Sequence, residues 1–273
     1  MKKKDIFDLT GRTAIVTGGA GILGRGFCKV LAGHGANVAI LDIDAELAGK
    51  SAEYIYEIIP QANLLPLACN VADPYEVSGS IAEVVGHFGE INILHNNAAT
   101  KTNNLNNFFE SFEDYSLDTW REVMAVNLDG MFLMAQAVGR QMLVQDYGGS
   151  IIQTSSIYGV VAPDQRIYAG SNYLGRQINT PAVYSASKSG VIGLTQYLAS
   201  YWGDKGIRVN TLTPGGVQSG QNNVFSKKFS QRVPLGRMGL GDELESALLF
   251  LASDASSYMT GQNLIIDGGL TCW

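Results

Sequence analysis

The stretch TGGAGILG, Thr17–Gly24, decides the fold, because it places four glycines between an apolar run and a run with helical periodicity. The preceding run, TAIV (Thr13–Val16), is typical of a strand that is buried on both faces. After the glycines, apolar residues recur at helical spacing as far as Gly35, which can end a helix. A glycine turn between such a strand and a helix directs backbone N–H groups and the positive end of the helix dipole at one point. That point suits a pyrophosphate.

Two glycine spacings fit this turn. Gly19, Gly21 and Gly24 spell G-x-G-x-x-G, the dinucleotide fingerprint, whereas Gly18, Gly21 and Gly24 spell G-x-x-G-x-x-G. Gly21 and Gly24 belong to both spacings, and the choice between Gly18 and Gly19 as the residue of closest approach stays open. Because a glycine pattern alone is a weak signal, the flanking segments must decide.

The same alternation of strand and helix continues along the whole chain. We expect helices at about 44–59, 73–88, 118–144, 184–202 and 242–252, with a proline or a glycine at several of their ends. We expect strands at 13–16, 37–41, 64–70, 91–97, 150–156, 207–214 and 263–269. This order predicts an α/β chain with a single-domain Rossmann fold over residues 1–273, in which helices cover both faces of a doubly wound, seven-stranded parallel sheet.

Composition excludes several other classes of protein. With 46% hydrophobic and 16% charged residues in 273, the chain can bury a large core. A net charge of −6 argues against a nucleic-acid partner. No apolar stretch approaches the roughly 18 residues of a membrane span, so no membrane partner is expected. The three cysteines and three histidines are dispersed, which predicts a reducing, cytoplasmic location and no metal site.

Asp42 is the residue that sets the cofactor prediction. It closes the second strand, 18 residues beyond Gly24, where an acidic residue is expected to accept hydrogen bonds from a ribose. Its charge would repel a 2′-phosphate, and Ile43 follows it in place of an arginine that could neutralise one. The sequence therefore predicts that NAD(H) is preferred over NADP(H). The alternative, that Asp42 only caps the next helix, is better served by Asp44.

The segment YSASK, Tyr184–Lys188, carries the expected chemistry. Tyr184 and Lys188 are four residues apart and share one face of a helix. An ammonium beside a phenol lowers the phenol's pKa, so Tyr184 could act as an acid or base near neutral pH. Tyr201 and Lys205 have the same spacing. That second pair lies at the far end of the helix, away from the carboxyl edge of the sheet, and we interpret it as an exposed helix end.

With these motifs the chain closely resembles the short-chain dehydrogenase/reductase family, and the resemblance covers nearly all of it. In that family's order it contains TGGAGILG, NNAA (Asn96–Ala99), VNLDG (Val126–Gly130), SSIYG (Ser155–Gly159), YSASK, RVNTLTPGGV (Arg208–Val217) and DGG (Asp267–Gly269). The resemblance implies that Tyr184 exchanges a proton with the substrate oxygen and that Lys188 holds the nicotinamide ribose. It further implies that Ser156 bonds the reacting oxygen and that Asn127 holds a water in a proton relay. The cofactor-binding residues that it implies are Gly18, Gly21, Ile22, Leu23, Asp42, Ile43, Asn70, Val71, Asn97, Ala98, Tyr184, Lys188, Pro214, Gly215, Val217 and Ser219.

One departure from the family pattern bears on the substrate. Ser156 and Tyr184 are 28 residues apart, a longer gap than the family usually has, which indicates an insertion at about 157–181 near the active site. The insertion is rich in hydrogen-bonding and aromatic side chains, which suit a polyhydroxylated ligand. Arg166, Tyr168 and Arg176 are the substrate-binding candidates, since an arginine could clamp a carboxylate. The alternative is a subunit contact or a surface loop. A second polar loop, 101–109, is expected at the same edge.

The leading hypothesis is an NAD(H)-dependent oxidoreductase that passes a hydride between nicotinamide and a secondary alcohol or ketone of a sugar or sugar-acid substrate. The alternatives are a 3-oxoacyl thioester reductase, which would want NADPH, and a non-enzymatic dinucleotide-binding sensor. An intact set of catalytic residues argues against a sensor. The resemblance also implies a homotetramer.

Overall fold

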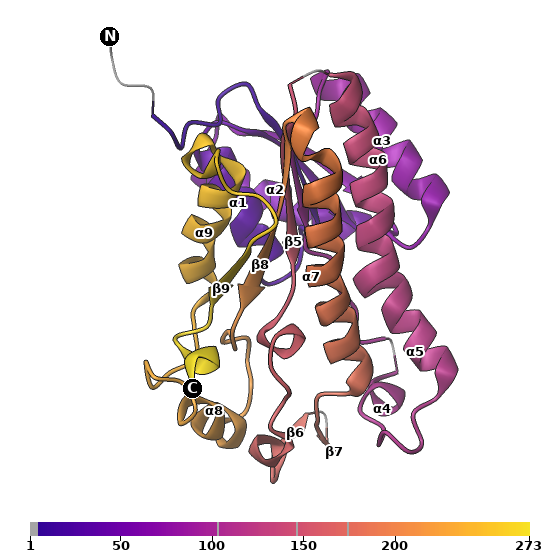
Figure 1. Cartoon of the computed structure of the whole chain (residues 1–273), viewed down its shortest axis with the longest axis vertical. Helices are drawn as coiled ribbons and strands as arrows, with labels where there is room; N and C mark the ends of the chain where they lie inside the picture. The colour runs from indigo at the N-terminus through magenta and orange to yellow at the C-terminus, as the bar shows by residue number, and fades with distance from the viewer. Residues whose placement is uncertain (1–4, 103, 146, 174) are drawn as a thin grey trace.

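The computed structural model describes residues 5–102, 104–145, 147–173 and 175–273. Its main strands are β1 (Thr13–Thr17), β2 (Asn37–Asp42), β3 (Asn63–Ala68), β4 (Ile93–Asn96), β5 (Gly149–Thr154), β8 (Ile207–Pro214) and β9 (Asn263–Ile266). Within the described residues these seven strands form one parallel sheet in the order β3-β2-β1-β4-β5-β8-β9 (Figure 1). The strand order reverses between β1 and β4, and open sheets of this kind bind ligands at such a switch point.

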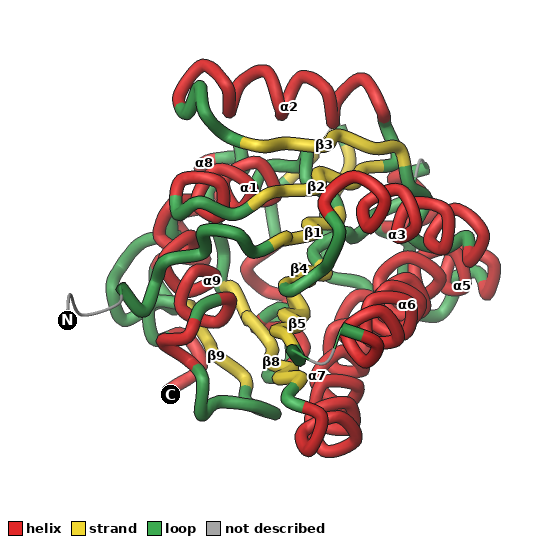
Figure 2. Tube along the Cα trace, turned by 90° about the horizontal axis from the view of Figure 1, so that it is seen from above, coloured by secondary structure: helices red, strands yellow, loops and turns green. Residues whose placement is uncertain are grey.

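Helices cover both faces of the sheet (Figure 2). One face carries α1 (Gly24–Gly33), α2 (Ala45–Ile58) and α9 (Glu245–Ala252), and the other carries α3 (Pro74–Phe88), α6 (Gly130–Val144) and α7 (Ala182–Trp202). All five residues of β1 are buried, which is why that strand is a continuous apolar run and does not alternate. The predicted α/β Rossmann fold, with a doubly wound seven-stranded parallel sheet, is confirmed.

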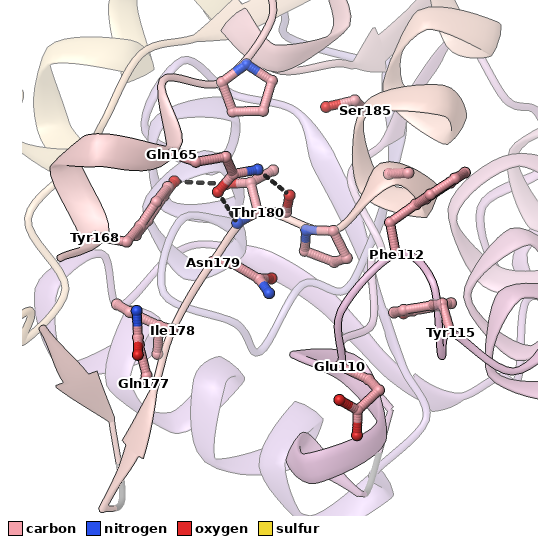
Figure 3. A pocket seen from close by; sticks show the side chains of 13 residues that line it. Glu110, Phe112, Tyr115, Gln165, Tyr168, Gln177, Ile178, Asn179, Thr180 and Ser185 are labelled. Atoms are coloured by element: carbon pink, nitrogen blue, oxygen red, sulfur yellow. Dashed lines mark hydrogen bonds between the residues drawn. The ribbon is translucent and has the colours of Figure 1, made fainter.

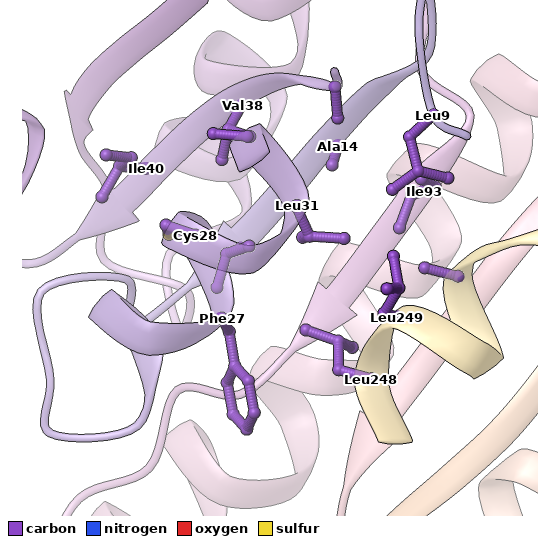
Figure 4. Packing of buried hydrophobic residues seen from close by; sticks show 14 of the residues in the cluster. Leu9, Ala14, Phe27, Cys28, Leu31, Val38, Ile40, Ile93, Leu248 and Leu249 are labelled. Atoms are coloured by element: carbon purple, nitrogen blue, oxygen red, sulfur yellow. The ribbon is translucent and has the colours of Figure 1, made fainter. Parts of the chain in front are cut away.

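The core on the α1 face joins segments from both ends of the chain. Phe27, Cys28 and Leu31 of α1 pack with Val38 of β2 and Leu248 of α9, and all five are fully buried (Figure 4). This packing fixes α1, and therefore fixes the glycine turn in front of it, against the sheet.

The expected helix 118–144 is two helices. α5 (Leu117–Met124) and α6 are joined by five residues of π-helix, Ala125–Asp129. π turns are rare in proteins, and those that do occur are often found at functional sites. Asn127 is in its middle and is completely buried. The periodicity of the sequence does not reveal this interruption, because a π turn keeps the chain helical.

Three short elements lie in segments for which we expected no regular structure. They are α4 (Leu105–Phe108), α8 (Asn223–Ser230) and an antiparallel hairpin of β6 (Asn172–Tyr173) and β7 (Arg176–Gln177). Four strands also end earlier than predicted: β3 at Ala68, β4 at Asn96, β5 at Thr154 and β9 at Ile266. Apolar periodicity does not predict α4, α8 or the hairpin because they are too short, and it does not fix the residue at which a strand ends.

The insertion folds against α8 and against the loop that follows β4. The Tyr168 ring stacks on Phe225 of α8 with centroids 5.3 Å apart. On the other side, the Arg176 Nη1 donates to the Asn106 carbonyl oxygen at 3.1 Å, and the Asn179 Nδ2 donates to the Phe109 carbonyl oxygen at 2.9 Å. The two polar loops predicted at one edge of the sheet therefore touch each other.

Over the described parts of the chain, no helix combines the length and the apolar content that a membrane crossing requires.

Candidate active site

The conformation of the glycine turn requires glycine at several of its positions. Gly18 adopts φ +60°, a left-handed conformation that favours glycine. A Cβ on Gly24 would lie only 2.0 Å from the Gly18 carbonyl oxygen, and one on Gly19 would lie 2.7 Å from the Ile40 side chain. The turn can therefore form only if these positions lack side chains. Gly19 faces the protein interior, which leaves Gly18 and Gly21 nearer to a ligand.

Helix α1 begins without a side-chain cap. Its N-cap residue, Leu23, makes no side-chain capping bond, and the first turn carries no acidic residue. Gly21, just before it, is exposed, and a Cβ at that position would come no closer than 3.2 Å to another atom. The N–H groups and the helix dipole at this end can therefore serve an anionic group.

Asp42 stands beside this turn. Its Oδ2 accepts a hydrogen bond from the Ala20 backbone N–H at 3.0 Å, across from the end of β1. The next helix is capped by Asp44, whose Oδ1 accepts from the Leu47 N–H at 3.0 Å. Asp44, and not Asp42, is therefore the N-cap of the next helix, as the sequence suggested.

Asn97 and Ala98 tie the end of β4 to the glycine turn. Both of their N–H groups donate to Thr17 Oγ1, at 3.0 and 3.1 Å. The Asn97 Nδ2 also lies 3.2 Å from the Thr17 carbonyl oxygen and 3.3 Å from that of Gly18. The amide thus holds the two strand ends together at the switch point.

Ser155 and Ser156 divide their work between structure and site. The Ser155 Oγ donates to the Lys188 carbonyl oxygen at 2.7 Å, so it is used to dock α7. The Ser156 Oγ accepts from the Tyr158 N–H at 3.2 Å and hydrogen-bonds to Tyr184. This arrangement supports Ser156, and not Ser155, as the residue that faces a reacting oxygen.

Tyr184 and Lys188 do not interact as we predicted. Burial raises the pKa of Tyr184, the hydrogen bond with Ser156 opposes that rise, and the charge on a Tyr168 phenolate would add to it. The Lys188 ammonium donates to the Thr154 carbonyl oxygen at 2.9 Å, and burial lowers its pKa to about 8. The expectation that Lys188 depresses the Tyr184 pKa is therefore wrong for this arrangement, because the ammonium bonds to the end of β5.

Asn127 keeps one polar atom unused. Its Oδ1 accepts from the Thr100 N–H at 2.8 Å, while its buried Nδ2 has no hydrogen-bond partner within the described residues. Such an orphaned donor is rare in a folded protein, and a water or a ligand commonly satisfies it. The π turn thus carries a side chain that is bonded to the segment after β4.

Two cavities meet at Ser156 and Tyr184. One, of about 210 Å³, extends from Leu23 and Asn97 past Lys188 to Val217. The other, of about 370 Å³, is bounded by the insertion, α4 and α8. Among the described residues they share Ser156, Tyr184 and Gly215.

A family model described as enoyl-(acyl carrier protein) reductase matches residues 18–271. D-threitol dehydrogenase of Mycolicibacterium smegmatis is 35% identical over 270 residues, which cover 97% of this chain and 95% of that protein.

The chain belongs to the short-chain dehydrogenase/reductase family.

Two further similarities accompany this assignment. NAD-dependent glycerol dehydrogenase of Listeria innocua is 32% identical over 273 residues, with 97% of this chain and 96% of that protein covered. The crystal structure of a gluconate 5-dehydrogenase from Burkholderia cenocepacia, in complex with NADP and tartrate, matches with a TM-score of 0.85 and 33% identity over 98% of each chain. The dehydrogenase thus transfers a hydride between a nicotinamide dinucleotide and a CH–OH group, and the prediction of an enzyme over a sensor is confirmed.

The residues of this dehydrogenase fit a dinucleotide. The end of α1 without a side-chain cap, the Gly18–Gly21 backbone and Asp42 lie together, and they would hold a diphosphate and its ribose. The smaller cavity, with Lys188, continues from there toward Tyr184. The smaller cavity is lined by five of the residues predicted to bind the cofactor, namely Leu23, Asn97, Pro214, Gly215 and Val217.

Other predicted cofactor residues have different surroundings. Ile22 and Ile43 are 72% and 73% exposed at the carboxyl edge of the sheet. The Asn70 Oδ1 accepts from the Ala72 N–H at 3.1 Å, and Val71 is buried against Gly130. Two of them, Ile22 and Ser219, line the larger cavity.

The three residues predicted to bind the substrate of this dehydrogenase have different surroundings. Tyr168 lines the larger cavity. Arg166 has 91% of its side chain exposed and forms a bidentate pair with Asp164, and Arg176 bonds to the Asn106 backbone. Neither arginine lines the cavity, which corrects the prediction of a carboxylate clamp. Arg166 is bonded to a carboxylate close by in the sequence, whereas Arg176 is bonded to Asn106, which is far away in the sequence. Residue spacing could not predict the second contact.

Sequence reasoning missed a chain of hydroxyl groups in the same cavity. The Tyr168 Oη lies 2.5 Å from Thr180 Oγ1 and donates to Tyr158 Oη at 3.3 Å. All three residues line the cavity that Tyr184 enters. Tyr158 and Thr180 stand close to motif residues in the sequence, but no spacing rule joins them, so only the folded chain shows the group.

Proposed function

We propose that the chain is an NAD(H)-dependent dehydrogenase of a neutral polyol and its ketose. The observation that carries the proposal is the meeting, at Ser156 and Tyr184, of the smaller cavity that begins at Leu23 with the larger, hydroxyl-lined cavity. In that arrangement a substrate carbon and a nicotinamide would approach each other at those two side chains.

The proposed roles follow from the contacts. The raised pKa favours the protonated Tyr184 phenol, which would give its proton to the oxygen of a substrate ketone during reduction. In the oxidation direction the phenolate form would take the proton of the alcohol while the hydride goes to the nicotinamide. Ser156 would hydrogen-bond the same oxygen, Lys188 would contact the nicotinamide ribose, and the free Nδ2 of Asn127 would hold a water. A bound nicotinamide supplies the hydride acceptor.

The preference for NAD(H) rests on Asp42. Its carboxylate stands at the end of β2 beside the glycine turn, where it would accept hydrogen bonds from both ribose hydroxyls. Ile43, which follows, offers no positive charge to a 2′-phosphate. The relatives include an NAD-dependent enzyme and an NADP-bound structure, so the residue at this position carries the argument.

The preference for a neutral polyol rests on the larger cavity. Its lining includes the hydroxyl groups of Tyr158, Tyr168 and Thr180, while Lys101 is the single charged residue among its described lining residues. The arginines predicted to clamp a carboxylate bond elsewhere, so Lys101 is the one cationic partner that a sugar acid would meet among these residues. The similarity to threitol and glycerol dehydrogenases supports the same choice.

The test is to follow NADH absorbance with a panel of three- to six-carbon polyols, aldonates and an oxoacyl thioester. We expect turnover with one or more polyols, and less with every aldonate of the same length. Turnover of the thioester alone would overturn the substrate class. A higher kcat/KM with NADP⁺ than with NAD⁺ would overturn the cofactor preference.

We also propose a homotetramer. Apolar side chains of α6 and α7 are exposed, including Phe132 at 45%, Val144 at 72% and Tyr197 at 64%. The rings of Tyr197 and Tyr201 stack with centroids 5.7 Å apart, which makes a flat apolar surface on α7. Light scattering coupled to size-exclusion chromatography tests the proposed tetramer, and the mass of a monomer would contradict it. A cytoplasmic location stays a prediction from the three free cysteines.

A further inference from the structure

A second cavity lies beside the one that Tyr184 enters. It measures about 590 Å³, and its walls come from the insertion, from the start of α7 and from the loop before α5 (Figure 3). This is within the range of about 300–1,000 Å³ that is usual for small-molecule sites. Tyr168 and segment 178–181 line both cavities and so form the wall between them. None of the proposed catalytic or dinucleotide residues lines this second cavity.

Three of its lining residues carry buried polar atoms that nothing in the described chain satisfies. These atoms are Tyr115 Oη, Asn179 Oδ1 and Ser185 Oγ. Seven such atoms occur in the described part of the chain, and each costs free energy unless a partner is supplied. Together they offer one acceptor and two hydroxyl groups that can donate or accept. Alcohol groups of a ligand match that combination, because each alcohol also donates and accepts.

The charge and the apolar surface narrow the ligand further. Glu110 is the sole charged side chain among the described lining residues, so an anionic ligand would be repelled. Phe112, with 75% exposure, lies on the same side as Tyr115 and opposite Ile178 (Figure 3). Apolar faces of this kind suit the C–H surface of a sugar. Burial and the Glu122 charge raise the pKa of Tyr115 to about 12, which keeps its hydroxyl protonated.

We propose that this cavity is a second binding site for a neutral, polyhydroxylated molecule, separate from the site of hydride transfer. The inference does not depend on which compound the enzyme oxidises, since the two cavities use different hydrogen-bonding groups except along their shared wall. A ligand bound here would contact the Asn179 side chain and press on the same wall that carries Thr180 toward the substrate.

The test is calorimetric titration of D-sorbitol and D-gluconate into the full-length, dinucleotide-free protein. We expect sorbitol to bind, and Tyr115→Phe and Ser185→Ala each to weaken its binding about three- to tenfold, the loss of one hydrogen bond. Tyr147→Phe is the matched control, because Tyr147 is 79% exposed and lines neither cavity. Gluconate should bind more weakly than sorbitol, and Glu110→Gln should reduce that difference.

Sorbitol binding that is absent, or that is equal in the wild type and in both variants, would overturn the inference. Two variants on different elements protect the test against the misfolding of one, which circular dichroism would reveal. If no polyol is oxidised but sorbitol binding remains sensitive to Tyr115→Phe, the proposed function fails and this site stands. If a polyol is oxidised but sorbitol binding is absent or is not weakened by Tyr115→Phe, the proposed function stands and this second site fails.

Discussion

The dinucleotide side and the substrate side of the site are built by different means. On the dinucleotide side, Thr17, Asp42, Asn97 and Thr154 come from the carboxyl ends of adjacent parallel strands, which a regular ladder places in one row. On the substrate side, short loops meet through side chain to backbone bonds, such as that between Asn179 and Phe109, 70 positions apart in the sequence. Regular structure makes the dinucleotide side rigid and predictable from the sequence, whereas the substrate side depends on individual contacts.

Tyr184 lies where the two sides meet, so its loss should have the largest effect. We expect Tyr184→Phe to lower kcat about 100-fold or more, because the proton donor is removed, while the Kd for NADH stays nearly unchanged. Steady-state kinetics and a fluorescence titration of NADH measure the two quantities. Tyr201→Phe is the matched control, since Tyr201 has the same spacing to a lysine but is 62% exposed. Unchanged turnover in Tyr184→Phe would remove this residue from the mechanism.

The rigidity of the dinucleotide side is tested at Gly24. A Cβ there would overlap the Gly18 carbonyl oxygen, so Gly24→Ala must move the turn. We expect NADH to bind at least about tenfold more weakly, in line with the 1–3 kcal/mol typical of overpacking. Gly49→Ala is the control, because a Cβ there meets nothing within 4 Å. NADH binding to Gly24→Ala as tight as to wild type would show that the turn yields.

The choice of dinucleotide is tested at Asp42. Asp42→Ala removes a carboxylate acceptor and its repulsion of a 2′-phosphate, so the ratio of kcat/KM for NADP⁺ to that for NAD⁺ should rise about tenfold or more. The comparison is with Asp44→Ala, which loses the α2 cap bond to Leu47 and should lower Tm while leaving the ratio alone. An equal ratio in both variants would contradict the role given to Asp42.

The smallest effect is expected on the substrate side, at Thr180. Thr180→Val removes the hydroxyl that bonds Tyr168 and should raise the polyol KM about three- to tenfold without changing NADH binding. Thr195→Val deletes a similar buried hydroxyl pair, with Thr211, that lines neither cavity. A rise in KM that is the same in both variants would mean that stability, and not recognition, sets the KM.

The sequence by itself determined the sheet, the turn and the row of residues along its edge. Strand β1 can be predicted because both its faces are buried, which makes its sequence a continuous apolar run. The glycine turn can be predicted because a Cβ at Gly19 or Gly24 would clash with neighbouring atoms. A Tyr-x-x-x-Lys spacing likewise puts Tyr184 and Lys188 on one helix face wherever the helix lies. These features depend on local backbone geometry, which a short segment specifies.

Only the tertiary structure decided the direction of the Tyr184 pKa, the positions of Arg166 and Arg176, and the group of Tyr158, Tyr168 and Thr180. Each depends on what lies across a gap between segments far apart in the chain. A pKa follows the burial and bonds of one atom, and a long side chain bonds to whichever oxygen comes within reach. Residue spacing carries no record of either, so this chemistry is settled only when the loops have packed.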